Sequence, residues 1–362
     1  MSVITQASIT DLEDRVQGLP GEARAIAARL LAVSTVDGVL DAPPEMHEWI
    51  TKFFGSVDVV REQRIVRVTN RVTYEGALFN GLRAKRPMEA KGGAEAQETI
   101  AKAAGDPFCL PLTGTPRDVF GRISSTHAVT ASNIAKYDGF HGVLVFAEHD
   151  PLAAADASVI RDYLVTGRQW AEAALNEDPA ARYYFLMWNS LWRAGGSIVH
   201  AHMQMTATRG MHYPKIELLR KQALEYDERH QRDYFDDLWA VHDALGLGIE
   251  LEGARAFASL TPIKEREVVI LGRPGEGEVA LAPAIARVLA AYRRMGVLAF
   301  NLACYLPPLS PDGTDWRRFP PVVRMVDRGD PANRTSDFGA MELYAASVIS
   351  ADPFRVAEAL RS

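Results

Sequence analysis

The sequence has little cysteine, no long apolar run and no block of a single charge. Only Cys109 and Cys304 occur among its 362 residues, and one distant pair is typical of a reducing compartment rather than of a disulfide scaffold. The N-terminal stretch MSVITQASITDLEDRVQ lacks the basic start and apolar core of a signal peptide. No apolar stretch approaches the length that spans a bilayer. We therefore expect a cytoplasmic protein.

Positive charge is not concentrated in any one segment, and the formal net charge is -6. This balance argues against nucleic acid or an anionic membrane surface as the main partner, although local basic clusters can still bind small anions. The hydrophobic share of 48% and the charged share of 24% are ordinary for a globular protein. The length allows two modest domains or one large one.

The first part of the chain is expected to be mainly helical. Residues 9–34 place apolar and charged side chains at helical spacing, and MHEWITKFF at 46–54 has the same character. From 57 to 74 valine, isoleucine and arginine alternate, which predicts a hairpin with one solvated face. We therefore predict a helical N-terminal extension over residues 1–56.

Two segments of the remaining chain share one order of elements. The predicted strands and helices of the first are 141–148, 150–175, 182–188 and 198–209, and those of the second are 254–260, 266–272, 281–295, 297–306 and 320–326. A helix over 338–349 and another after Pro353 end the chain. The pattern predicts an α+β protein with two related half-domains, 57–212 and 213–362, each an antiparallel sheet flanked by helices.

Two of the nine histidines stand one residue apart in GGSIVHAHMQM, residues 195–205. Successive side chains of a strand point to opposite faces, so His200, His202 and Gln204 share one face. Met203 and Met205 fall on the other face and are expected in the core.

Three roles fit the polar face of this strand. The histidines could be buried structural residues, they could bind zinc with further ligands from elsewhere, or one could attack phosphorus and form a covalent intermediate. Gly195, Gly196 and Ser197 precede them, and glycine lets backbone N–H groups approach a phosphate closely. The residues alone leave all three roles open.

The run from Asn189 to Gln204, NSLWRAGGSIVHAHMQ, closely resembles the active-site stretch of galactose-1-phosphate uridylyltransferase, in the nucleotidyl-transferring branch of the histidine triad superfamily. The resemblance implies a HIT-like fold, with His202 as the nucleophile that carries a nucleoside monophosphate and His200 as its support. It further implies that Gln204 donates hydrogen bonds to the phosphate. An amide is a poor acid or base, so Gln204 favours transfer over hydrolysis.

Other stretches support the same resemblance. LRAKRP, residues 82–87, is similar to the arginine-bearing nucleotide segment of the family, which makes Arg83 and Arg86 candidates for phosphate binding. Asn133 matches the position that contacts the nucleoside. Asn189 is expected to shape the loop before the histidines.

Metal ligands follow from the resemblance as well. The family's zinc site pairs a Cys-x-x-Cys motif with two histidines, and the matching residues here are Asp106, Cys109, His149 and His200. One cysteine is thus replaced by aspartate, and a simply buried Cys109 is the alternative. A second metal site of some members needs a late His-x-His pair, and no histidine follows His242. We therefore predict possible structural Zn²⁺ and no second metal. His127 and His141 are expected to be structural.

The segment FGAMELYAAS is loosely similar to the one that supplies a sugar-contacting glutamate, which makes Glu342 a candidate ligand. The tyrosine before that glutamate is Met341 here, so galactose is not supported as the sugar.

Together these matches predict a nucleotidyltransferase with ping-pong kinetics. It would take a nucleoside monophosphate from a nucleotide sugar or similar nucleotide and pass it to a phosphate-bearing acceptor. Phosphorylases of nucleotide sugars or dinucleoside polyphosphates share the motif and use inorganic phosphate, so they are the alternative. A non-catalytic nucleotide-binding protein is the third hypothesis. The resemblance also implies a homodimer.

Overall fold

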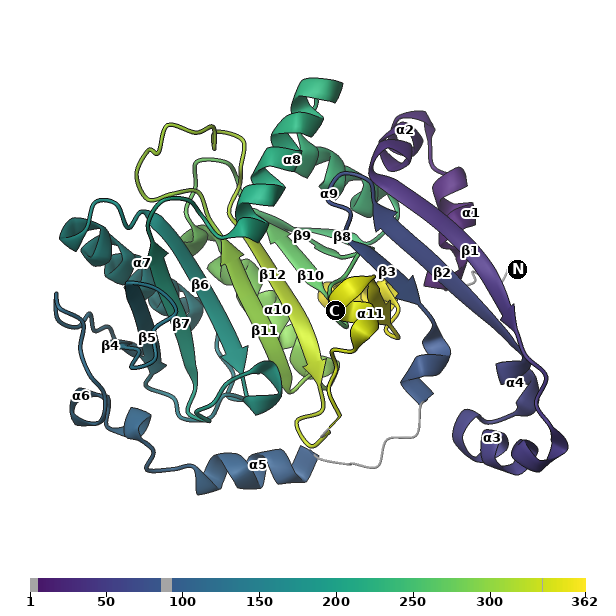
Figure 1. Ribbon diagram of the computed structural model, residues 1–362, viewed down its shortest axis with the longest axis horizontal. Helices are drawn as coiled ribbons and strands as arrows, with labels where there is room; N and C mark the ends of the chain where they lie inside the picture. Colours follow the sequence, from purple (N-terminus) through teal and green to yellow (C-terminus); the bar gives the residue numbers. More distant parts are fainter. Residues whose placement is uncertain (1–5, 86–92, 334) are drawn as a thin grey trace.

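The computed structural model describes residues 6–85, 93–333 and 335–362, which form two sheets with helices around them (Figure 1). The larger sheet holds the strands β4 Ala128–Ser132, β5 Phe140–Phe146, β6 Tyr183–Ser190, β7 His202–Thr208, β8 Gly248–Leu251, β9 Ala254–Ala258, β10 Val268–Leu271, β11 Ala299–Tyr305 and β12 Val322–Gly329. Its spatial order is β4-β5-β7-β6-β11-β12-β10-β9-β8, and all neighbours are antiparallel.

The large sheet is built from a repeated unit. In the first half β4 and β5 are followed by helix α7 (Ala157–Glu177) and then by β6 and β7. In the second half β9 and β10 are followed by helix α10 (Ala282–Arg294) and then by β11 and β12. Both halves place their fourth strand between the second and the third, and they meet where β6 pairs with β11. The predicted α+β class with related halves is confirmed.

Helix α7 packs closely on one face of the first half of the sheet, because two glycines at the contact have no side chain to keep the helix and the sheet apart. A Cβ on Gly142 of β5 would lie 2.6 Å from the Trp170 ring, and one on Gly167 of α7 would lie 2.7 Å from the Tyr184 hydroxyl. Met203 and Met205 have no exposed surface and belong to this core. Their position confirms the predicted alternation along β7, so its histidine-bearing face points away from the helix.

The predicted helix over 9–34 is wrong. The structure has two short helices, α1 (Leu12–Gln17) and α2 (Gly21–Leu30), followed directly by strand β1 (Leu31–Val39). Pro20 interrupts the helical pattern because its backbone is extended (ψ 158°) and it has no N–H to donate. β1 pairs with β2 (Glu62–Asn70) along its whole length, so the N-terminal segment contributes a strand as well as helices.

The smaller sheet has the order β1-β2-β3-β13, with β3 at Gly76–Phe79 and β13 at Ser347–Ile349. The predicted hairpin at 57–74 is therefore displaced: a short helix, α4 (Val57–Arg61), precedes β2, whose partners are β1 and β3. The domain limits after 56 and 212 stay predictions. Strands pair across both of them, β1 with β2 and β6 with β11.

Helices surround the two sheets. They are α3 His47–Phe54, α5 Gly93–Lys102, α6 Pro111–Gly114, α8 Pro214–His230, α9 Tyr234–Ala244, α11 Ala340–Tyr344 and α12 Pro353–Arg361, with the 3-10 turns η3 Gly81–Lys85 and η4 Pro107–Cys109. The predicted helix over 338–349 is shorter than expected, since β13 begins at Ser347 and pairs in parallel with β3.

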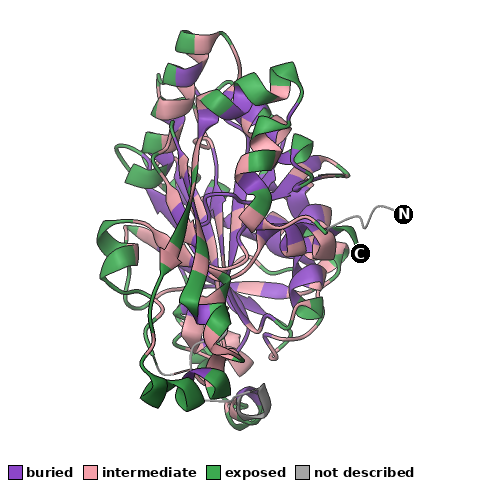
Figure 2. Cartoon of the chain, turned by 90° about the vertical axis from the view of Figure 1, so that its right-hand side faces the viewer, coloured by how far each residue is buried: buried purple, intermediate pink, exposed green. Residues whose placement is uncertain are grey.

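Buried residues gather in the interior, where the strands and the inner faces of the helices meet (Figure 2). The strands β1 and β2 of the smaller sheet carry more exposed positions. None of the helices in the described part of the chain is long and apolar enough to cross a membrane.

Candidate functional site

The loop that delivers the chain into β7 is held in an unusual backbone conformation. Leu191 has a φ of 66° and Gly195 a φ of 93°, both in the left-handed region that favours glycine. Gly196 has no space for a side chain, because a Cβ there would lie 2.8 Å from the Asn189 carbonyl oxygen and 3.0 Å from that of Leu191. The sequence GGS thus forms a tight turn, and the Ser197 side chain is exposed beside it.

Asn189 shapes this loop with a partner from the second half of the chain. The Asn301 side-chain amide donates to Asn189 Oδ1 (2.7 Å) and to the Ala194 carbonyl oxygen (2.8 Å). Sequence analysis missed Asn301, because its role depends on the pairing of β6 with β11, which places it opposite Asn189.

His202 is the first residue of β7, and 6% of its surface is exposed. Its Nδ1 lies 2.8 Å from the His200 carbonyl oxygen, which can only accept, so the ring proton is on Nδ1. Burial lowers the pKa of His202 below its ordinary value and outweighs that hydrogen bond, which raises it. The ring is therefore neutral at pH 7, with an unprotonated Nε2 that no hydrogen bond from the described residues occupies.

The candidate nucleophile, His202, lies beside an aromatic ring on one hand and polar side chains on the other. The Phe108 ring meets the His202 ring edge to face at a centroid distance of 5.2 Å. Gln204 lies two positions along the same face, and its Oε1 is 3.0 Å from Nε2 of His141. Asn133 Nδ2 is 3.2 Å from the same nitrogen. The structure thus brings Asn133 to Gln204 through a histidine that the sequence pattern had assigned a structural role.

The four predicted metal ligands converge. Asp106, Cys109, His149 and His200 each offer one ligand atom, and these atoms all lie within 4.8 Å of one another. Cys109 Sγ is 3.4 Å from His149 Nδ1 and 3.5 Å from His200 Nδ1. The two Nδ1 atoms are 3.0 Å apart, and Asp106 Oδ1 is 3.8 Å from His200 Nδ1.

The donor set fits a tetrahedral cation. Metal–ligand bonds of about 2.0–2.3 Å give tetrahedron edges of roughly 3.3–3.8 Å, close to the separations observed. His200 Nε2 donates to the Phe146 carbonyl oxygen (2.8 Å) and His149 Nε2 to that of Ile100 (3.1 Å), so both Nδ1 lone pairs face the centre. Asp106 Oδ2 is buried without a hydrogen-bond partner in the described residues. The cluster can hold a divalent metal ion.

Two predicted ligands lie elsewhere, and one is outside the described residues. Arg83 lines a hollow of about 440 Å³ beside Trp49 of α3, and Figure 1 shows η3 and α11 next to the smaller sheet rather than at β7. Partial burial raises the pKa of Glu342, but the Gly339 backbone N–H and nearby cations lower it overall. Arg83 is one of those cations, so it lies near Glu342. Arg86 falls outside the described residues.

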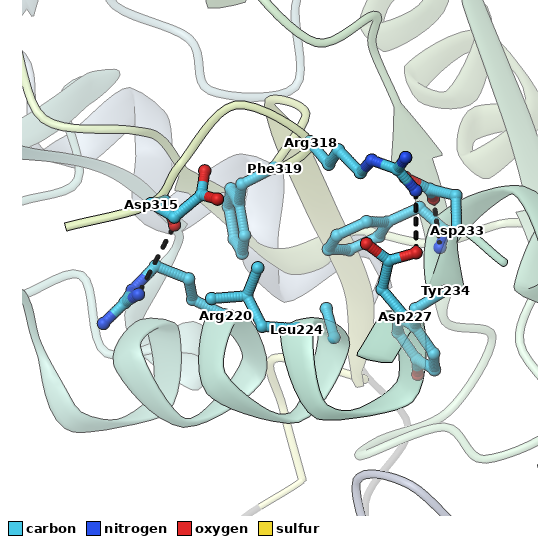
Figure 3. A pocket seen from close by; sticks show the side chains of 10 residues that line it. Arg220, Leu224, Asp227, Asp233, Tyr234, Asp315, Arg318 and Phe319 are labelled. Atoms are coloured by element: carbon cyan, nitrogen blue, oxygen red, sulfur yellow. Dashed lines mark hydrogen bonds and ion pairs between the residues drawn. The ribbon is translucent and has the colours of Figure 1, made fainter. Parts of the chain in front are cut away.

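A separate cavity between α8 and the loop before β12 is unrelated to this site (Figure 3). Its volume of about 20 Å³ has room for a single water. Arg318 and Asp227 form an ion pair of 2.7 Å at its edge, and the Arg220 guanidinium donates to the Asp315 carbonyl oxygen. These contacts join α8 to the loop and leave no space for a substrate.

No protein-family model and no curated protein sequence matches the chain. Solved structures match its fold. An ADP-glucose phosphorylase from Arabidopsis thaliana with bound ADP-glucose has a TM-score of 0.62 at 16% identity, over 81% of this chain and 97% of that chain. A GalT-like protein from the same plant has a TM-score of 0.60 at 16% identity, over 80% and 96% of the two chains. A uridylyltransferase has a TM-score of 0.56 at 17% identity, over 76% and 92%. The fold expected from the resemblance is therefore confirmed.

Proposed function

We propose that this protein is a nucleotidyltransferase that moves a nucleoside monophosphate from a nucleotide sugar, or a similar nucleotide, to a phosphate-bearing acceptor. The observation that carries the proposal is the state of His202. A neutral ring with its proton fixed on Nδ1 leaves the Nε2 lone pair available as a nucleophile, at the end of a glycine-rich loop.

The reaction has two displacements at the α-phosphorus. His202 Nε2 attacks, an N–P bond forms, and the P–O bond to the sugar 1-phosphate breaks, so that the leaving phosphate takes the electron pair. An oxygen of the acceptor phosphate then attacks the same phosphorus, and the N–P bond breaks to return the pair to Nε2. Both leaving groups are weak bases, so positioning and electrostatics carry most of the catalysis.

Groups around His202 match the charges that develop during these two displacements. The ring becomes cationic when Nε2 is bonded to phosphorus, and the Nδ1–H bond to the His200 carbonyl oxygen stabilises that cation. Gly195, Gly196 and Ser197 would hold the phosphate, with the Gln204 amide as a further donor. Arg83 and Glu342 would act on the sugar or acceptor only if a second chain or a movement brought them to β7.

Asp106, Cys109, His149 and His200 would hold a zinc ion, whose contribution is structural. Through these residues a bound ion would tie η4 to the segment before β7. His200 would then link the two sites, since its ring belongs to the cluster and its carbonyl oxygen holds the nucleophile. We place this zinc, a cytoplasmic location and a homodimer together as parts of the proposal.

A phosphorylase that uses inorganic phosphate as acceptor is the second candidate. The similarity to ADP-glucose phosphorylase favours it, because that enzyme has the fold of this chain and was solved with a nucleotide sugar. ADP-glucose and UDP-glucose are therefore the first donors to test.

Intact mass spectrometry after incubation with each donor tests the proposal. The expected result is an added nucleoside monophosphate, which is absent in His202→Gly and retained in His242→Gln, a change to a buried histidine of the second half. Formation of labelled nucleoside diphosphate from labelled phosphate, or of a new nucleotide sugar from a different labelled sugar 1-phosphate, then identifies the acceptor. If no donor labels the chain, the non-catalytic alternative replaces the proposal.

A further inference from the structure

A buried histidine behind Gln204 connects that side chain to the backbone of the neighbouring loop. His141 has no exposed surface. The Tyr137 backbone N–H donates to its Nδ1 (3.0 Å), and its Nε2 lies 3.0 Å from Gln204 Oε1. The Tyr137 ring stacks on the imidazole at a centroid distance of 4.4 Å.

The contacts fix which nitrogen of His141 carries the proton. The Tyr137 backbone N–H can only donate, so Nδ1 has a lone pair, and the ring proton must be on Nε2. Asn133 Nδ2 also lies near Nε2, at 3.2 Å. Accepting from it would leave the imidazole with no proton at all, which is excluded at neutral pH. The Nε2–H group therefore donates to Gln204.

The Nε2–H group of His141 determines which of its two orientations the Gln204 amide adopts. The oxygen and the nitrogen of an amide have nearly the same shape, so packing alone does not choose between them. With Oε1 held by His141, the two N–H groups of Gln204 point away from it, on the face shared with His202 roughly 7 Å along the strand. The reversed amide would place a carbonyl oxygen there, which repels the oxygens of a phosphate.

We propose that His141 is a positioning residue that fixes the orientation of the Gln204 amide, so that Gln204 donates to the phosphoryl oxygens. This inference deepens the proposed function and rests on it. Burial lowers the pKa of His141, which keeps the ring neutral and its single proton on Nε2. His141 itself does not touch the substrate and acts only through Gln204.

The test is a double-mutant cycle on the rate of nucleotidyl-histidine formation at saturating donor. His141→Phe keeps a stacking ring without a donor, and Gln204→Met keeps the length of the side chain without an amide. Gln204→Met is expected to lower the rate roughly 100- to 1,000-fold, as loss of one donor to a developing charge does, and His141→Phe to lower it by up to the same factor. The double variant should be no slower than Gln204→Met alone, and donor affinity should change less than the rate.

Three controls separate positioning from folding and from the proposed function. His141→Gln, whose amide can still donate to Oε1, is expected to keep more activity than His141→Phe, with midpoints of unfolding measured for both. His242→Gln, at a buried histidine with backbone partners, should keep the wild-type rate. In ¹⁵N spectra of the resting protein, His141 should be unprotonated at Nδ1 and protonated at Nε2.

This inference would be overturned, and the transferase left intact, if the double variant lost the product of the two single losses in rate. A wild-type rate in His141→Phe would overturn it in the same way. A ¹⁵N spectrum with the proton on Nδ1 would overturn it without any activity measurement. A wild-type protein that forms no adduct would instead refute the proposed function.

Discussion

Gly196→Ala is expected to damage both stability and catalysis, because the turn before β7 leaves no space for a methyl group. The new Cβ would lie 2.8 Å from one backbone oxygen and 3.0 Å from another, against 3.4–4 Å for ordinary contact. Backbone atoms cannot move aside as a side chain can, so the loop must shift by roughly 0.5 Å. Overpacking of this kind costs about 1–3 kcal/mol of unfolding free energy.

Two glycines with open surroundings serve as controls. Gly195→Ala meets no atom within 4 Å but has a φ of 93°, so its cost should be about 1–2 kcal/mol, from backbone strain alone. Gly21→Ala, at the start of α2, also meets nothing and has no such φ, so stability should be unchanged or raised by up to about 1 kcal/mol.

Urea unfolding and the rate of adduct formation would measure the two effects. Because a displacement of about 1 Å can cost 100-fold in rate, a shift of half that size should lower adduct formation by roughly tenfold. If Gly196→Ala unfolds like Gly21→Ala and keeps the wild-type rate, the tight turn described here does not exist in solution.

Three further predictions concern acid stability, metal and the junction of the halves. Burial lowers the pKa of His212 and His242 to about 4, below the 6.5 of the unfolded chain. The unfolded state then binds more protons, so unfolding free energy should be constant above pH 6.5 and fall between 6.5 and 4, by about 3 kcal/mol per histidine at most. His242→Gln should flatten that fall in urea titrations at each pH, and an unchanged slope would contradict the assignment. Purified protein should contain close to one zinc per chain by elemental analysis, and Cys109→Ser should lower that content; an equal content in both would exclude the cluster. Asn301→Ala removes three hydrogen bonds, two donated to the loop and one accepted from Arg328, and should cost about 1–3 kcal/mol in urea unfolding as well as slowing adduct formation. A loss of unfolding free energy no larger than that caused by replacing an exposed asparagine would refute the role of Asn301 at the loop.

Local patterns predicted much of strand β7. Alternation placed Met203 and Met205 in the core and His202 on the opposite face, and this feature depends only on neighbours along one strand. The cluster of Asp106, Cys109, His149 and His200, which the structure brings together, was expected only from the family resemblance, because its members are distant in the sequence.

Features that depend on the pairing of strands distant in the sequence could not be predicted from local patterns. Asn301 matters only because β11 lies beside β6, and His141 matters because β5 lies beside β7. The helical spacing of residues 9–34 failed for a different reason, since Pro20 outweighs periodicity and β1 is fixed by its pairing with β2. Arg83 stays a prediction as a ligand, since it lines the hollow beside Trp49 and the smaller sheet.

The pairing of β6 with β11 has a consequence for which residues of the second half can change. Five residue pairs join these strands, from Phe300 with Ser190 to Cys304 with Leu186. Without the second half, β6 would be a bare, apolar sheet edge prone to aggregation. The second half, which lacks the His-x-His motif, is thus free to change its other side chains as long as β11 continues to cover the edge of β6.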